Sequence, residues 1–152
     1  MISADNWFVI ASSAELHPTK PLPRTVLNRP LVLFRTEGRV VVLQDRCPHK
    51  NVALSLGRVQ QNTLECRYHG WCFNADGRLT RVPCHAPHEA LPKVQVPVYP
   101  CIEQDDWIWV YLGAELPTVG PPSYPKARDH GWFELHNVMQ APVDLILENG
   151  VD

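Results

Sequence analysis

Proline is spread along the whole sequence, and its spacing limits the secondary structure that the chain can form. The 152 residues contain 15 prolines and 8 glycines. Proline inside a helix removes a backbone donor and clashes with the preceding turn, and no long stretch with a helical period survives between these residues. The sequence therefore predicts short strands and turns, in a chain long enough for one domain and the start of a second.

Several apolar stretches, rich in branched and aromatic residues, have the length of strands. Two of them flank Gly38 and predict a hairpin. Asp76–Gly77 predicts a second hairpin, because this dipeptide suits the positive φ that tight turns need. A third is predicted with its turn in the acidic residues 103–106. We expect a small, mostly antiparallel β domain up to about residue 115.

The character of the sequence changes after this predicted domain. Residues 116–130 are rich in proline and predict a linker. After them we expect a strand and then a helix that opens near Pro142, with acidic residues at its start. The predicted organisation is a domain over 1–115, a linker over 116–130, and a short α+β fragment over 131–152 that begins another domain.

Composition and charge argue against several classes of protein. The formal net charge is -2, and 45% of the residues are hydrophobic, as in ordinary globular domains. No long run of either charge is present, which argues against binding to nucleic acids or membrane surfaces. Residues 1–13 lack the pattern of a signal peptide or a membrane span. The odd number of cysteines, five, indicates a reducing, cytoplasmic compartment with free or metal-bound thiols.

Two pairs of cysteine and histidine are the strongest chemical signal in the sequence. Cys47 and His49 have the spacing C-x-H, Cys66 and His69 have the spacing C-x-x-H, and 16 residues separate the pairs. Each pair lies at the end of a predicted strand, so two hairpin loops side by side would present four ligands to one site. Thiolates and imidazoles are typical ligands of zinc, copper and iron–sulfur centres.

Three interpretations of these pairs stay open on the residues alone. Structural zinc sites commonly group their cysteines, as C-x2-4-C followed by H-x3-5-H, which is not the order here. One Cys and one His from each loop instead suit a two-iron cluster in which one iron takes both cysteines and the other takes both histidines, as in Rieske [2Fe-2S] centres. The third interpretation is coincidence, with buried thiols and surface imidazoles that bind no metal.

The stretches CPHKNVAL and CRYHGWCFNADGRL, which begin at Cys47 and Cys66, resemble the Rieske domain of the Rieske-type non-heme iron oxygenases, the ring-hydroxylating oxygenase α-subunit family. The resemblance covers most of the chain. It implies an antiparallel β-sandwich with a small cluster-binding subdomain of two hairpin loops. It also implies that the two cysteines bind the more buried iron and that His49 and His69 bind the iron nearer the surface.

The same resemblance assigns roles to residues around the ligands. Lys50 and Tyr68 would line the loops of the [2Fe-2S] cluster, and Trp71 would pack beside it, although plain core packing also explains Trp71. Respiratory Rieske proteins carry an extra cysteine in each loop, and this sequence has none there. We therefore expect the oxygenase or ferredoxin branch, with a reduction potential at the low end of a range of about -150 to +300 mV.

The last third of the sequence bears on the choice between these branches. A Rieske-type ferredoxin would end near Gly113, but 39 residues follow it. Asn149 and Asp152 match an N-x-x-D pattern that, in the oxygenases, leads to the first histidine ligand of a mononuclear Fe(II). The resemblance implies that Asp152 bridges electron transfer between subunits of a homotrimer; a polar helix end is the other interpretation. The ligands of that Fe(II) are absent here, so we expect a fragment of an oxygenase.

The function implied is electron transfer through a [2Fe-2S] cluster within an oxygenase that hydroxylates, dioxygenates or demethylates an organic substrate with O2. The electron donor would be a reductase or a ferredoxin. With no obvious pairing for a β subunit, a monooxygenase or demethylase is favoured. A stand-alone ferredoxin-type carrier is the alternative function, and a plastid is the alternative to the cytoplasm. We interpret residues 84–89, CHAPHE, as a loop that covers the domain, with Cys84 buried, and not as a second metal site.

Overall fold

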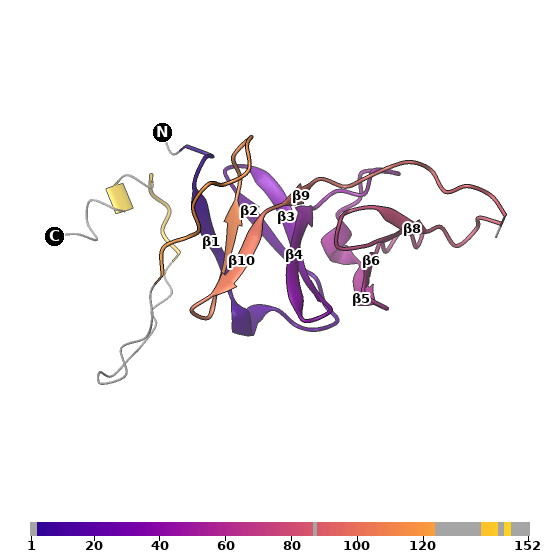
Figure 1. Ribbon diagram of the computed structural model, residues 1–152, viewed down its shortest axis with the longest axis horizontal. Coiled ribbons are helices and arrows are strands. Elements are labelled where there is room, and N and C mark those ends of the chain that lie inside the picture. Colours follow the sequence, from indigo (N-terminus) through magenta and orange to yellow (C-terminus); the bar gives the residue numbers. More distant parts are fainter. Residues whose placement is uncertain (1–2, 87, 124–137, 143–144, 147–152) are drawn as a thin grey trace.

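The computed structural model describes residues 3–86, 88–123, 138–142 and 145–146 (Figure 1). Within these residues it is almost entirely β, as predicted, and every sheet is antiparallel. The elements are β1 (Trp7–Ser12), η1 (Ser13–Glu15), β2 (Leu22–Val26), β3 (Arg29–Thr36), β4 (Arg39–Gln44), η2 (Leu54–Leu56), β5 (Arg58–Gln60), β6 (Thr63–Glu65), β7 (Cys72–Phe73), β8 (Leu79–Arg81), β9 (Val98–Tyr99), β10 (Cys101–Gln104) and β11 (Trp107–Tyr111).

The strands form three sheets. Sheet A has the order β1-β11-β10, sheet B has the order β2-β3-β4-β9, and sheet C has the order β5-β6-β7-β8. Sheets A and B form the expected sandwich, and sheet C, a run of very short strands, is the expected smaller subdomain (Figure 1). Sheet B lies between the other two. One of its faces packs with sheet A in one cluster of buried side chains, and the other face packs with sheet C in a second cluster.

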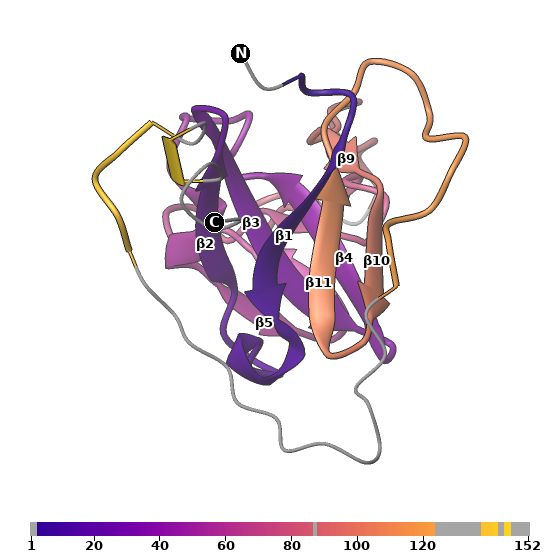
Figure 2. The same ribbon diagram turned by 90° about the vertical axis from the view of Figure 1, so that its left-hand side faces the viewer.

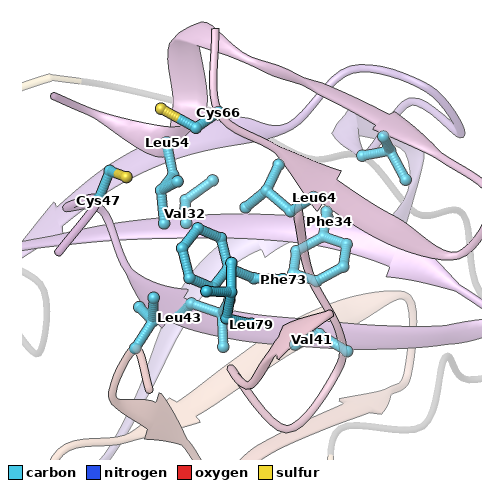
Figure 3. Close-up of a cluster of buried hydrophobic side chains, with 12 residues drawn as sticks. Val32, Phe34, Val41, Leu43, Cys47, Leu54, Leu64, Cys66, Phe73 and Leu79 are labelled. Carbon is cyan, nitrogen blue, oxygen red and sulfur yellow. The ribbon is translucent and has the colours of Figure 1, made fainter. Parts of the chain in front are cut away.

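Alternation along β3 explains why this strand reads as a continuous apolar run. Leu31 and Leu33 are buried in the cluster that includes Ile108 of sheet A. Val32 and Phe34 point the other way and are buried in the cluster that includes Phe73 of sheet C (Figure 3). A strand covered on both faces has no solvent-facing positions for polar residues, so its side chains are apolar at successive positions.

Two-residue turns join four pairs of consecutive strands. Both residues of each turn have positive φ, as in the type I′ turns that match the twist of a hairpin. The residues of the four turns are Leu27–Asn28, Glu37–Gly38, Gln61–Asn62 and Asp105–Asp106. The predicted hairpins at Gly38 and at the acidic residues 103–106 are therefore confirmed. The predicted hairpin at Asp76–Gly77 is also confirmed, with Gly77 at φ +71° and a longer loop between β7 and β8.

Sequence reasoning missed three strands, β2, β5 and β9. The first two are short and carry exposed polar or proline residues at alternate positions, so they lack the apolar pattern of a strand. β9 is a two-residue edge strand that pairs only with Val42 and Leu43 of β4. These strands form because their neighbours offer a paired edge, which local sequence does not reveal.

The proline-rich segment is bonded to sheet A over its described part (Figure 2). The indole Nε1 of Trp7 donates to the carbonyl of Val119 (2.8 Å), and the side chain of Gln104 donates to the carbonyl of Pro122 (3.1 Å). The hydroxyl of Ser123 donates to the carboxylate of Asp105 (2.9 Å). We call residues 114–123 the proline strap. Its bonds hold it against the sheet, although it contains no strand.

Little of the predicted second part is described. The N–H of Ile146 donates to the carbonyl of Pro142 (3.2 Å), which is one helical turn where a helix was expected. The rest of the predicted linker beyond Ser123, together with Asn149 and Asp152, lies outside the described residues. No helix in the described part of the chain is long and apolar enough to cross a membrane.

Candidate metal centre

The two Cys-His pairs lie in two loops with the same backbone hydrogen bonds. In the first loop, Cys47–Val52, the N–H of the first residue donates to the last carbonyl (2.8 Å), and the N–H of Asn51 donates to the first carbonyl (2.8 Å). In the second loop, Cys66–Trp71, the same two bonds measure 2.8 and 3.0 Å, the second from Gly70. Each loop is thus a cysteine, a three-residue turn and a closing pair of residues.

The fifth residue of each loop has a left-handed backbone. Asn51 has φ +59° and Gly70 has φ +67°. Asparagine and glycine are the residues that adopt this conformation at least cost. The Asn51 side chain accepts a hydrogen bond from Nε of Arg46 (2.8 Å), whereas a Cβ on Gly70 would lie 2.7 Å from Cγ of Pro83. The first loop is therefore held by a side chain, and the second by close packing.

The thiols of Cys47 and Cys66 lie together at one end of the core. Both residues are 2% exposed, and both belong to the buried cluster around Leu54 (Figure 3). Burial raises the pKa of the Cys47 thiol, backbone N–H groups that point to its sulfur oppose the change, and the adjacent Cys66 raises the pKa further. Two adjacent thiols in an apolar place both ionise readily only beside a positive charge, such as a metal ion.

The imidazoles form a second pair on the outer side of the loops. The ring centroids of His49 and His69 are 4.6 Å apart, with 63° between the ring planes. His49 is half-buried and His69 is exposed. Burial lowers the pKa of His49, as do the nearby His69 and Lys50. These effects favour the neutral form of the ring, which is the form that binds metals.

One ring nitrogen of this pair lacks a hydrogen bond within the described part of the chain. Nδ1 of His49 is buried and has no hydrogen-bond partner among the described residues. A buried polar atom without a partner costs about 1–3 kcal/mol, and a bound metal ion would satisfy it. The orphaned Nδ1, the paired thiols and the paired imidazoles together fit an iron–sulfur cluster of the two-cysteine, two-histidine type.

The other predicted residues surround these ligands. The ring of Trp71 stacks on His49, with centroids 4.5 Å apart and 3° between the planes, and Trp71 also packs against the core cluster. The ring centroids of Tyr68 and His69 are 3.9 Å apart. Tyr68 is 61% exposed. Lys50 is exposed, and its charge acts on His49. Both interpretations of Trp71, core packing and contact with the centre, are therefore compatible.

The four candidate ligands form two pairs rather than one group. Within the described part of the chain, no three His, Cys, Asp or Glu side chains are close enough to hold a single ion. A structural zinc site needs four ligands around one ion. One site for each pair instead matches a cluster in which the two irons have different ligands.

The stretch CHAPHE does not form a metal site in the described residues. Cys84 is exposed, so the expectation that its thiol is buried was wrong. Nδ1 of His85 lies 3.0 Å from the carboxylate of Glu89 within the same loop. Pro83, just before this stretch, packs on Gly70. The interpretation as a covering loop agrees with these contacts.

Sequence reasoning missed the residues that shape the two loops. These residues are Asn51, its hydrogen-bond partner Arg46, and Pro83, which packs against Gly70. A signal was present in the sequence, since an Asn or a Gly stands four residues after each cysteine. Two ligand loops with left-handed residues at the same offset predict two turns of the same kind.

Comparisons with known proteins point to one family. A family model described as Rieske [2Fe-2S] domain matches residues 6–100. Chlorophyllide a oxygenase of Arabidopsis thaliana is 32% identical over 96% of this chain. The oxygenase subunit of 3-chlorobenzoate-3,4-dioxygenase from Comamonas testosteroni is 36% identical over 92% of this chain. The solved structure of NdmA from Pseudomonas putida CBB5 has a TM-score of 0.76 and 32% identity over 83% of this chain.

The relatives are much longer than this chain. The chain spans 27% of the chlorophyllide a oxygenase, 31% of the dioxygenase subunit and 40% of the NdmA chain. The similarity therefore covers one part of each relative, and that part includes the two ligand loops.

Proposed function

Because this chain belongs to the Rieske [2Fe-2S] domain family, we propose that Cys47 and Cys66 bind one iron of the cluster and that His49 and His69 bind the other. The observation that carries the assignment is the pairing itself. Two loops with one backbone pattern place two buried thiols together and two imidazoles together. The match to the family model spans both loops and supports the same four residues.

The burial of the four residues orders the centre from inside to outside. The cysteines are 2% exposed, while His49 is half-buried and His69 is exposed. We assign Nδ1 of His49 to the iron, because this atom is buried and has no partner among the described residues. Nε2 then holds or releases the proton. When bound, the cluster supplies one-electron transfer, and the exposed histidine side is where electrons enter or leave.

The residues around the ligands tune the site. Trp71 holds the plane of the His49 ring by stacking on it and excludes water from that side. Tyr68 contacts the ring of His69 at the surface. The positive charge of Lys50 disfavours a proton on His49, and so keeps the imidazole available to the metal.

We further propose that the chain is the N-terminal electron-transfer part of a Rieske non-heme iron oxygenase. The relatives named as oxygenases align over more than nine-tenths of this chain, well beyond Gly113. That extent supports an oxygenase over a stand-alone ferredoxin. The complete enzyme would hydroxylate, dioxygenate or demethylate an organic substrate with O2. The compartment would be the cytoplasm, or a plastid as in the chloroplastic relative.

The link to a second iron rests on Asn149 and Asp152. In this proposal, Asp152 connects the cluster of one subunit to a mononuclear Fe(II) in its neighbour within a homotrimer. Both residues lie outside the described part of the chain, and the sequence itself supports the proposal through their spacing, N-x-x-D.

An electron donor, a reductase or a ferredoxin, would meet a basic surface. Residues 46–71 contain four Lys or Arg side chains and one acidic side chain, Glu65, although the whole chain carries a net charge of -2. Arg46, Lys50 and Arg67 are exposed beside the candidate ligands. An acidic donor would therefore be attracted to this side of the molecule, at a rate that falls as salt is added.

Reconstitution of the chain with iron and sulfide tests the cluster assignment. We expect two irons and two sulfides per chain, and the electron paramagnetic resonance (EPR) signal of a reduced cluster with mixed nitrogen and sulfur ligands. Cys66→Ser and His49→Ala should each abolish or strongly reduce uptake. Cys84→Ser and His88→Ala, which change the same residue types outside the loops, should bind iron as the parent does. Stoichiometric zinc without sulfide would contradict the assignment. We also expect no hydroxylation by this chain alone.

A further inference from the structure

Four paired residues, one on each strand of sheet C, form a row at the base of the second loop. Arg58 of β5 pairs with Glu65 of β6, Glu65 pairs with Cys72 of β7, and Cys72 pairs with Arg81 of β8. We call these four residues the cross-strand row. Glu65 directly precedes the second loop and Cys72 directly follows it, so the row lies where that loop leaves and rejoins the sheet.

Glu65 is the centre of the row. It is buried, with 9% of its surface exposed. One carboxylate oxygen accepts hydrogen bonds from Nε and Nη2 of Arg58 (3.1 and 2.8 Å). The other accepts hydrogen bonds from Nη2 of Arg81 (2.9 Å) and from the side chain of Gln60. A buried carboxylate is tolerated only when it is paired in this way, so this is a specific arrangement and not a chance surface contact.

Cys72 connects the row to the backbone of the loop. Its thiol donates to the carbonyl of Gly70 (3.3 Å) and accepts a hydrogen bond from Nε of Arg81 (3.4 Å). Gly70 in turn donates through its N–H to the carbonyl of Cys66 (3.0 Å). A continuous path of hydrogen bonds therefore runs from Arg81 to the candidate ligand Cys66.

A β-bulge at Cys72/Phe73 places the side chain of Arg81 in this row. Phe73 pairs with Leu79, and both are buried in the core, but Cys72 pairs with Arg81, which shifts the register by one residue. In a regular strand, Thr80 would stand opposite Cys72, and Arg81 would share the core face with Leu79. The extra residue brings the second arginine to the carboxylate of Glu65.

We propose that Glu65 is a positioning residue of the metal centre: together with Arg58 and Arg81 it braces the base of the second loop and holds Cys66 in place for the cluster. The proposal rests on the proposed function, since it takes Cys66 as a ligand. The row also carries one more positive than negative charge beside the ligand thiols. Removal of Glu65 or of Arg81 therefore changes the local charge in opposite directions.

The test compares Glu65→Gln with a matched control, Glu103→Gln. Glu103 also pairs with an arginine, Arg35, through two hydrogen bonds, but it lies in sheet A, away from the loops. In the reconstituted full chain, Glu65→Gln should lose iron to a chelator about tenfold faster than the parent, as is typical when a partner of a metal ligand is removed. Its EPR signal should change. Glu103→Gln should match the parent in both.

The midpoint potential supplies a readout that simple loss of packing would not produce. Glu65→Gln removes a negative charge, so the potential should become more positive. Arg81→Gln removes a positive charge, so the potential should become more negative, and Arg81→Lys should restore it in part. Arg81→Gln also keeps the carboxylate bonded to Arg58, so it provides the comparison if Glu65→Gln does not fold.

The outcomes separate this proposal from the assignment of the cluster. If the parent chain binds the cluster and Glu65→Gln matches it in iron release and EPR signal, the positioning role is overturned and the cluster assignment stands. Equal effects of Glu103→Gln, or shifts of potential in the same direction for Glu65→Gln and Arg81→Gln, also overturn it. A parent chain that takes up no iron and sulfide overturns the proposed function, and the positioning role with it.

Discussion

At the scale of single residues, Trp71 contributes both to packing and to the geometry of the centre. It stacks on His49 with 3° between the ring planes and packs against the core. We predict that Trp71→Ala lowers the free energy of unfolding of the metal-free chain by about 2–3 kcal/mol, less than for a fully buried tryptophan. Trp71→Phe, which keeps an aromatic ring over His49, should lose less than half of that. Urea denaturation followed by circular dichroism measures both, and equal losses would contradict the role of stacking.

The five cysteines should differ sharply in reactivity. Cys47 is buried, and burial raises the pKa of its thiol, so in the metal-free chain at pH 8 it stays protonated and shielded. Cys84 is exposed. We predict that iodoacetamide modifies Cys84 first and Cys47 only slowly, as measured by mass spectrometry of peptides. In urea all five should react at similar rates. Modification of folded Cys47 as fast as Cys84 would show that the site is more open than in this structure.

Residue identity predicted the candidate ligands but not their support. The spacing of Cys47, His49, Cys66 and His69 was enough to expect one centre, because few other arrangements place two thiols and two imidazoles in adjacent hairpins. Glu65 gave no such signal. A lone glutamate before a cysteine is usually a solvated side chain, and its burial depends on two arginines from other strands. Only the pairing of the strands brings these together.

At the scale of loops and strands, Gly70 shows how backbone conformation constrains the centre. Its φ is +67°, and a Cβ would approach Pro83 within 2.7 Å. We predict that Gly70→Ala destabilises the chain by about 2 kcal/mol, from the left-handed backbone and the contact with Pro83. Asn51→Gly, at the equivalent position, keeps the backbone and loses only the bond from Arg46, so it should cost about 1 kcal/mol or less. Thermal denaturation measures both, and an Asn51→Gly loss as large as that of Gly70→Ala would contradict the packing argument.

The ion pair between Arg35 of β3 and Glu103 of β10 joins sheets A and B. The hydrogen bond from Arg35 is the main cause that lowers the pKa of Glu103 below its usual 4.5. A lowered carboxyl pKa means that its contribution to stability is present above pH 4.5 and is lost as the pH falls through the folded-state value. The stability difference between the parent and Glu103→Gln should therefore be largest near neutral pH and shrink in acid.

Urea denaturation at pH 7 and at about pH 3 measures this difference. Glu37→Gln is the control, because Glu37 and Arg39 are both mostly exposed and their atoms are 3.9 Å apart, so no measurable change is expected at either pH. A Glu103→Gln difference that stays constant with pH would show that packing, and not charge, explains its effect.

The sequence predicted strands well where an apolar run and a recognisable turn occur together. β3 and β4 were found because their apolar runs and the turn at Gly38 agree. β5 was not found, since Arg58 and Gln60 on its exposed face are polar and its turn, Gln61–Asn62, lacks glycine. Its pairing with β6 depends on tertiary contacts, as does the bulge that re-aims Arg81.

At the scale of the whole molecule, sheets B and C differ in the length and burial of their strands. The central strands of sheet B, β3 and β4, have eight and six residues and are buried on both faces, whereas the strands of sheet C have two or three residues. We predict that removal of the metal speeds amide hydrogen exchange in residues 58–81 far more than in residues 29–44. Hydrogen exchange with mass spectrometry tests this, and a uniform increase over both regions would contradict it.

The proline strap has a consequence for everything that follows it in a longer polypeptide. It is tied down by Trp7 and by the turn between β10 and β11, at the end of the molecule farthest from sheet C (Figure 1). Ser123 thus lies on sheet A, whereas Cys47 and Cys66 of the two ligand loops are buried on the opposite face of sheet B. A downstream domain that begins near Ser123 would start on the far side of sheet B from these ligands, while a neighbouring molecule could approach them directly.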